Sequence, residues 1–166
     1  MVLLVHLTSL NNRNSVLRSG IKPQFYRQEY PKGVFAMPVI PDYYVSHQWL
    51  RELKRSGQRN ICGVYFRIPD EQDVYVGHYN RTHLHTTISE AAAIIIQADN
   101  PQGYEVFIPR KIAANEIQRV KALPQVLGWR YYPEAHGHKP CGCPACLLRG
   151  EIKSQKIRQA WNADEK

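Results

Sequence analysis

The sequence has no long apolar run, no internal repeat and no low-complexity segment. Its 166 residues contain no apolar run of the roughly 18 residues that a membrane-spanning helix needs. The apolar stretch at residues 2–5 is too short for the core of a signal peptide, and His6 interrupts it. At 43% hydrophobic residues, the chain is also too apolar for a disordered tail. We therefore expect one cytoplasmic domain without contact to a membrane.

Cysteine is scarce, and three of the four cysteines lie close together. Cys141, Cys143 and Cys146 follow two histidines, His136 and His138, in a segment rich in Gly and Pro. A reducing compartment disfavours a disulfide framework, and zinc takes four nitrogen or sulfur ligands in a tetrahedron. We predict a structural zinc site made of the three cysteines and His138, with His136 or the distant Cys62 as alternative fourth ligands. No paired CxxC ribbon is present.

Acidic residues are few in the first part of the chain. The net charge is +8, and residues 1–60 hold nine Lys or Arg against three acids. A basic surface of this kind attracts polyanions, because phosphate contacts supply most non-specific affinity for nucleic acids. A solvated basic surface that only keeps the protein soluble is the alternative interpretation.

Strand-like and helix-like segments alternate irregularly, with too few long crossovers for a doubly wound sheet. The fold class that fits is α+β, with a mostly antiparallel, split sheet and flanking helices. We divide the chain into a domain at 1–132 and an appended zinc-binding loop with a basic helix at 133–166. Strands are predicted at 2–8, 33–37, 61–68, 73–78, 104–108 and 129–132. Helices are predicted at 12–20, 42–57, 91–98, 113–123 and 147–161.

Two segments carry a resemblance to a known family. The first is Val5-His6-Leu7-Thr8-Ser9, followed by a helix that ends at Gly20; the second is Gly103-Tyr104-Glu105-Val106-Phe107-Ile108-Pro109. Together they resemble the first and last sequence blocks of the ADP-ribosyltransferase superfamily. Within this superfamily, the two segments are most similar to DNA-modifying toxins of the DarT type. Their similarity to RNA 2′-phosphotransferases is more distant. A middle block is matched by Gly33-Val34-Phe35-Ala36.

The resemblance implies NAD-dependent transfer of ADP-ribose to a nucleic acid or nucleotide. Glu105 would stabilise the oxocarbenium-like charge on the ribose C1 and accept the proton of the nucleophile. His6 and Thr8 would bind the adenosine side of NAD, the helix ending at Gly20 would lead to the pocket, and Phe35 would line the nicotinamide site. Phe35 lacks the hydroxyl of the usual tyrosine or serine. The residues before Glu105 lack the Gln or Glu of arginine-modifying enzymes, which argues against a protein-arginine acceptor.

A histidine-rich stretch, residues 78–85, is the other candidate for chemistry. His83 and His85 are two residues apart and would share a side in a strand. They could form a two-histidine metal pair or, with Arg81, a phosphate-binding site, but no carboxylate lies at close spacing for a catalytic metal, and the role of His78 is open. We expect a loop with partly exposed histidines.

A second functional class remains open on the same residues. In this alternative the chain is a non-catalytic, zinc-containing module that binds nucleic acid through phosphate and base contacts. The phosphate contacts would come from the basic C-terminal helix, with Arg149, Lys153, Lys156 and Arg158. The base-stacking residues would be Tyr26, Tyr30, Tyr131 and Tyr132.

Overall fold

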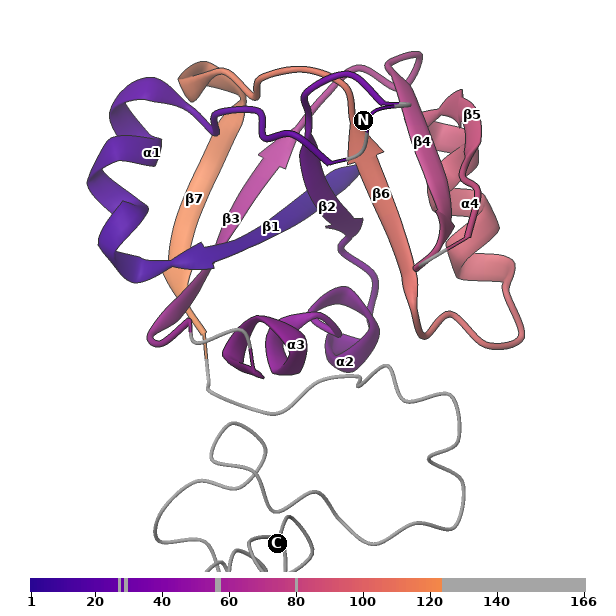
Figure 1. Cartoon of the computed structure of the whole chain (residues 1–166), viewed down its shortest axis with the longest axis horizontal. Coiled ribbons are helices and arrows are strands. Elements are labelled where there is room, and N and C mark those ends of the chain that lie inside the picture. The colour runs from indigo at the N-terminus through magenta and orange to yellow at the C-terminus, as the bar shows by residue number, and fades with distance from the viewer. Residues whose placement is uncertain (27, 29, 56–57, 80, 124–166) are drawn as a thin grey trace, which may run out of the picture.

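The computed structural model describes residues 1–123, apart from 27, 29, 56–57 and 80 (Figure 1). The predictions for residues 124–166, namely the strand at 129–132, the cysteine loop and the C-terminal helix, lie outside the described residues. The strands are β1 (Leu3–Ser9), β2 (Val34–Pro38), β3 (Ile61–Arg67), β4 (Asp73–His78), β5 (Leu84–Thr87), β6 (Tyr104–Ile108) and β7 (Ile117–Ala122). The helices are α1 (Arg13–Ser19), α2 (Tyr43–Ser46), α3 (Leu50–Arg55) and α4 (Ile88–Gln97), with single 3-10 turns η1 (Leu10–Asn12) and η2 (Ala114–Glu116).

The strands form one seven-stranded sheet in the order β5-β4-β6-β2-β1-β3-β7. Every pair of neighbouring strands is antiparallel, so the predicted α+β class with antiparallel pairing is confirmed. β1 pairs with β3 along its whole length, but with β2 only at Leu4↔Pro38 and Val5↔Met37. Beyond these two pairs, the sheet opens between β1 and β2.

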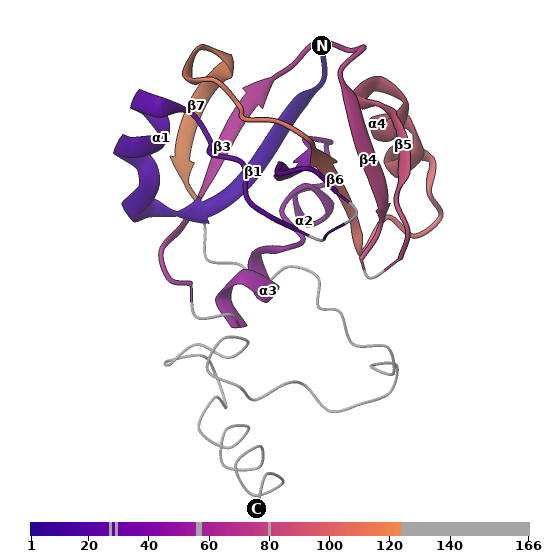
Figure 2. The ribbon, with the colours of Figure 1, turned by 45° about the horizontal axis from the view of Figure 1, so that its top comes forward.

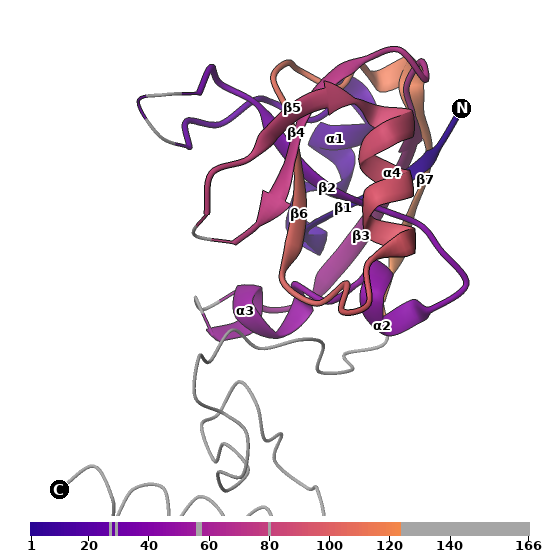
Figure 3. The same ribbon diagram turned by 90° about the vertical axis from the view of Figure 1, so that its right-hand side faces the viewer.

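The two faces of the β4–β6 part of the sheet differ in chemistry. One face carries aliphatic side chains, including Val76 and Val106, and α4 covers it with Ile88, Ala91 and Ile95, all of them buried. The opposite face carries Phe107 and Tyr75, which are cross-strand partners. The segment between α1 and β2 lies on this aromatic side, opposite α4 (Figure 3). Burial on one face thus leaves the other face available for a site.

Gly20 ends α1 and directs the chain along the sheet. Its φ of 77° lies in the left-handed region that favours glycine, and its N–H donates to the Val16 carbonyl. Ile21 then forms an isolated antiparallel bridge with Ile112, and α1 lies beside β7 (Figure 2). A Cβ on Gly20 would stand 2.0 Å from the Ile112 carbonyl oxygen, so this contact requires glycine. The helix predicted to end at this glycine is confirmed.

The helix predicted over 42–57 is broken into two. α2 ends at Ser46 and α3 begins at Leu50, because the residues between them turn toward the loop before β6. The buried Gln48 accepts from the Gly103 N–H and donates to the Pro101 carbonyl, and the indole of Trp49 donates to the Tyr104 carbonyl. These long-range hydrogen bonds outweigh continuation of the helix.

The prediction of a helix over 113–123 is wrong. After η2 the chain forms β7, in which Val120 pairs with Val64 of β3. Without β7, the β3 backbone groups on that side would lack partners, and this non-local requirement overrides the helix-like spacing of the apolar residues. β7 is an edge strand, and Arg119 and Lys121 are exposed on it.

The histidine-rich stretch also departs from prediction. The chain is irregular as far as His83 and becomes a strand at Leu84. His83 is buried rather than partly exposed, whereas His85 is exposed. In the part of the chain that the structure describes, no helix has the length and apolar character to cross a membrane.

We predict that Gly20→Ala destabilises the protein by about 2 kcal/mol or more. An alanine would have to hold a positive φ and would clash with the Ile112 carbonyl. The free energy of unfolding, measured by urea titration with circular dichroism, should fall accordingly. Asn14→Ala, at an exposed position of the same helix, is the control and should leave it nearly unchanged. Equal stability of the two variants would contradict the assignment.

Candidate functional site

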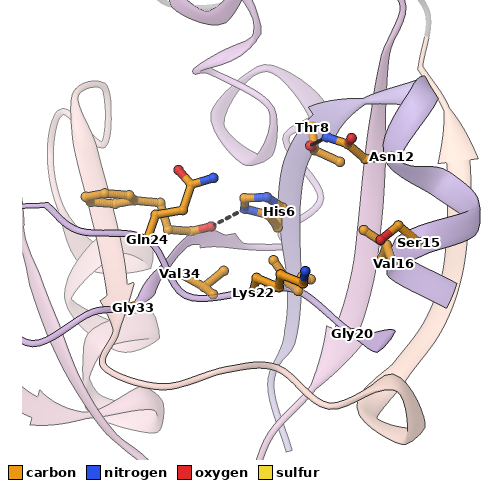
Figure 4. Close-up of a pocket in the computed structure, with 12 residues that line it drawn as sticks. His6, Thr8, Asn12, Ser15, Val16, Gly20, Lys22, Gln24, Gly33 and Val34 are labelled. Atoms are coloured by element: carbon orange, nitrogen blue, oxygen red, sulfur yellow. Dashed lines mark hydrogen bonds between the residues drawn. The ribbon is translucent and has the colours of Figure 1, made fainter. Parts of the chain in front are cut away.

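A pocket of about 230 Å³ occupies the opening between β1 and β2 (Figure 4). β1 contributes His6 and Thr8, and β2 contributes Val34 and Phe35. The remaining lining residues come from the end of η1, from α1 and from the segment that joins α1 to β2: Asn12, Ser15, Val16, Gly20, Ile21, Lys22, Gln24 and Gly33. The candidate NAD contacts expected from the sequence therefore meet at one pocket: His6, Thr8, Gly20 and Phe35.

His6 stands where β1 and β2 separate. Its Nδ1 lies 2.7 Å from the Phe35 carbonyl oxygen, and because a carbonyl only accepts, Nδ1 carries the proton and donates. Burial lowers the pKa of His6 below its usual value, although the Phe35 hydrogen bond opposes this shift. The ring is therefore neutral at neutral pH, which leaves Nε2 as an acceptor at the pocket. A sugar hydroxyl is a suitable donor for such a nitrogen.

Thr8 and Asn12 form the polar end of the pocket. The Asn12 Nδ2 donates to the Thr8 Oγ1 at 2.9 Å, so the threonine hydroxyl keeps its own hydrogen for donation. Lys22, exposed on the segment after α1, adds a positive charge to the rim. This combination of one acceptor, hydroxyl and amide donors and one cation suits a sugar–phosphate ligand.

Phe35 connects the pocket with the aromatic face of the sheet. Its ring lies 4.7 Å from the Tyr26 ring in an edge-on arrangement and 5.0 Å from the Phe107 ring. Gly33 makes room for this cluster, because a Cβ there would stand 2.5 Å from the Phe107 ring and 2.3 Å from the Ile108 carbonyl oxygen. Edge-on and tilted packing of this kind holds the Phe35 ring in place next to the pocket.

Glu105 does not line the pocket itself but lies on the same sheet face as Phe35. Phe35 pairs with Phe107, and Glu105 is two residues from Phe107 along β6, so the three side chains share a face. Glu105 is only 7% exposed. Its Oε1 accepts from the Tyr26 hydroxyl and from His83 Nε2, each at 3.1 Å. Tyr26 thus connects Phe35, at the pocket wall, with the carboxylate.

The carboxylate of Glu105 keeps one oxygen without a partner. Both hydrogen bonds reach Oε1, and within the described residues no donor contacts Oε2. No guanidinium pairs with Glu105 in that part of the chain, so the surrounding groups are a phenol and an imidazole. A buried carboxylate with one free oxygen can accept a hydrogen bond or a proton from a ligand.

The other candidate residues lie away from this pocket. His78 contacts the Tyr79 carbonyl and packs against Tyr104, and exposed His85 lies 3.9 Å from Asp73. Among the described residues, no group of three His, Cys, Asp or Glu could hold a metal. The predicted zinc ligands Cys141, Cys143, Cys146 and His138, and the alternative His136, lie outside the described residues.

Cys62 is in the hydrophobic core rather than at the surface. Its Sγ lies 3.7 Å from the Ser9 carbonyl oxygen, and burial raises the pKa of its thiol. Zinc binds cysteine as thiolate, so burial that raises the pKa of the thiol makes Cys62 a poorer zinc ligand. Of the three alternatives for the fourth ligand, the structure thus disfavours Cys62.

Sequence reasoning did not assign roles to Tyr26 or His83 at Glu105. Tyr26 was expected only as a residue for base stacking, and His83 only as part of a histidine stretch. The available signal was Gly77, because a glycine inside a strand often marks close approach of another group. Its partner across β6 is Glu105.

The lowered pKa of His6 predicts acid sensitivity. Well above the ordinary histidine pKa of 6.5, the ring is neutral in both the folded and the unfolded state. As the pH drops below that value, the unfolded chain takes up the proton first, so the free energy of unfolding decreases. His47, whose pKa burial also lowers, contributes in the same direction. Urea titrations between pH 7.5 and 5 should give a shallower pH dependence for His6→Gln than for wild type. Thr8→Ala should keep the wild-type slope; equal slopes for all three proteins would disprove the assignment.

No protein-family model matches the chain, and neither does any curated protein or solved structure in the comparisons. Its function is therefore inferred from the pocket, the aromatic face and the carboxylate described above.

Proposed function

We propose that the protein is an NAD-dependent transferase with an ADP-ribosyltransferase-like fold that moves ADP-ribose to a nucleic acid or nucleotide. The observation that carries this proposal is the convergence of His6, Thr8 and Phe35 on one pocket, with Glu105 on the same sheet face as Phe35. The resemblance suggested these residues from separate sequence blocks. The opening between β1 and β2 supports the finer expectation of a split sheet.

The pocket suits part of a dinucleotide. At about 230 Å³ it is smaller than the roughly 300–1,000 Å³ of sites that enclose a drug-sized ligand, so the remainder of NAD would lie along its open side. His6 Nε2 would accept from a ribose hydroxyl, Thr8 would donate to the ligand, and Lys22 would face the pyrophosphate. Phe35 would hold the nicotinamide ring by its flat face.

Glu105 would supply the chemistry. The bond that breaks joins the ribose C1 to the nicotinamide nitrogen, which leaves with the electron pair. The positive charge that develops on the ribose is stabilised by a carboxylate hydrogen-bonded to a ribose hydroxyl, for which Oε2 is free. The acceptor then attacks C1, and the proton it loses passes to the carboxylate.

The aromatic face supports a nucleobase acceptor. Phe107 lies two residues after Glu105 on β6, and from there the face continues across the sheet through the cross-strand pairs Phe107–Tyr75 and Tyr75–His85 to the edge strand. The Tyr75 and His85 rings lie 4.8 Å apart, and Tyr30 packs edge-on against Tyr75. Bases stack on such rings whatever their sequence, and the net charge of +8 attracts the phosphates.

We predict that Glu105→Gln reduces NAD turnover at least about a hundredfold while NAD binding stays within a few-fold of wild type. The amide keeps the shape of the side chain but has neither the charge nor the basicity that the reaction requires. Release of nicotinamide is measured by chromatography with single-stranded DNA or RNA as acceptor, and binding by calorimetry. Asp99→Asn, an exposed carboxylate on the same protein, is the control.

Two outcomes would refute the transferase. One is wild-type protein that neither binds nor cleaves NAD with any acceptor; the other is full turnover by Glu105→Gln. Nucleic-acid binding that weakens steeply with salt but ignores Glu105, without NAD turnover, would instead favour the non-catalytic zinc-containing module.

Zinc remains part of the proposal on the basis of the sequence. We predict about one zinc per full-length chain by elemental analysis, held by Cys141, Cys143, Cys146 and His138. Cys143→Ser should lose the metal, since only three of the four ligands would remain. Cys62→Ser, which removes the buried thiol, should keep it. Loss of the metal in Cys62→Ser would instead identify Cys62 as the fourth ligand.

A further inference from the structure

His83, just before β5, lies over Gly77 of β4 and beside Glu105 of β6. Gly77 pairs with Glu105 between β4 and β6, and Val76 pairs with Leu84 between β4 and β5, so His83 comes next to Gly77 on its other side. A Cβ on Gly77 would lie 3.0 Å from the Cα of His83 and 3.1 Å from its Cγ and Cδ2. The imidazole therefore occupies the space that another residue's side chain would fill at position 77.

The His83 ring is enclosed by this arrangement. Its side chain is 0% exposed, and its Nε2 lies 3.1 Å from Oε1 of Glu105. The rings of Tyr26 and Tyr30 stand edge-on at 6.1 and 5.8 Å, and the His83 N–H donates to the Tyr30 hydroxyl. The ring is thus packed between the two tyrosines and Gly77, with Nε2 toward the carboxylate.

The other ring nitrogen of His83 has no partner. Nδ1 is buried and makes no hydrogen bond within the described residues. A buried polar atom without a partner destabilises the fold, and a histidine that served only the packing of the core would be expected to satisfy both nitrogens. Among the described residues, the only side-chain hydrogen bond of His83 is the one to Glu105. The ring is thus oriented for the carboxylate at the expense of its second nitrogen.

We propose that His83 is a positioning residue for the carboxylate of Glu105. Because an ionised carboxylate oxygen only accepts, Nε2 carries a proton and donates to Oε1, which fixes the carboxylate plane and turns Oε2 toward the ribose hydroxyl. Gly77 is part of the same device, since its missing side chain admits the ring. This inference rests on the proposed transferase function.

The first test separates the Nε2 donor from the volume of the ring. His83→Leu fills the space without a donor and should lower kcat for NAD cleavage about 10- to 100-fold, with KM for NAD within about twofold of wild type. His83→Gln restores an N–H donor near the position of Nε2 and should recover most of the loss. Wild-type kcat in His83→Leu would overturn the proposal, as would equal losses in the two variants.

The second test displaces the ring without changing it. Gly77→Ala should reproduce the kcat loss of His83→Leu, because its Cβ would push the ring away from Glu105. Gly63→Ala is the matched control: its Cβ would be equally crowded, 3.0 Å from the Tyr65 ring, but on β3, and kcat should stay near wild type. Thermal unfolding of both variants monitors folding; equal kcat in the two alanine variants contradicts the role of Gly77.

A measurement without turnover distinguishes this inference from the proposed function. Nitrogen-15 NMR of the full-length protein labelled at histidine should show the His83 Nε2 protonated, with a signal that shifts in Glu105→Gln. An unprotonated Nε2 overturns the positioning role even if NAD is cleaved. A protonated Nε2 in a protein that does not consume NAD would show that the hydrogen bond exists and that the transferase proposal fails.

Discussion

The hydrogen bond from the His6 imidazole to the Phe35 carbonyl is the contact on which the site depends. β1 and β2 share only two residue pairs, and past them each strand must satisfy its backbone groups in another way. The imidazole provides a donor to the carbonyl at the point of separation. It therefore allows the sheet to open without an unsatisfied carbonyl, and it sets the orientation of both the ring and the strand that carries Phe35.

Much of the fold follows from local signals in the sequence. β6 spans Tyr104–Ile108, as predicted from the sequence, between Gly103 and Pro109. α1 ends at Gly20, whose positive φ favours glycine. β7 was not predictable in this way, because the spacing of Ile117, Val120 and Leu123 also fits a helix. Pairing with the edge of β3 selects the strand over the helix. That pairing depends on a distant segment, so it cannot be read from the residues of β7 alone.

The candidate site likewise has one part that the sequence predicts and another that depends on distant strand pairing. The family resemblance rests on short motifs that contain His6, Thr8, Gly20 and Phe35, so their meeting at one pocket could be anticipated from that resemblance. The environment of Glu105 could not, because it depends on residues that come together only through pairing of β4 with both β5 and β6. A glycine and a histidine six positions apart carry no local pattern that identifies them as neighbours of a carboxylate.

The two ends of the sheet have different consequences for association. β7 presents Arg119 and Lys121 on its exposed positions, and Arg119 also lies over the Tyr65 ring, 4.6 Å from its centre. A second molecule that tried to extend the sheet by adding its own β7 would bring like cations together, at an electrostatic cost that rises as salt is removed. This border thus discourages fibril-like stacking of one molecule on another through β7.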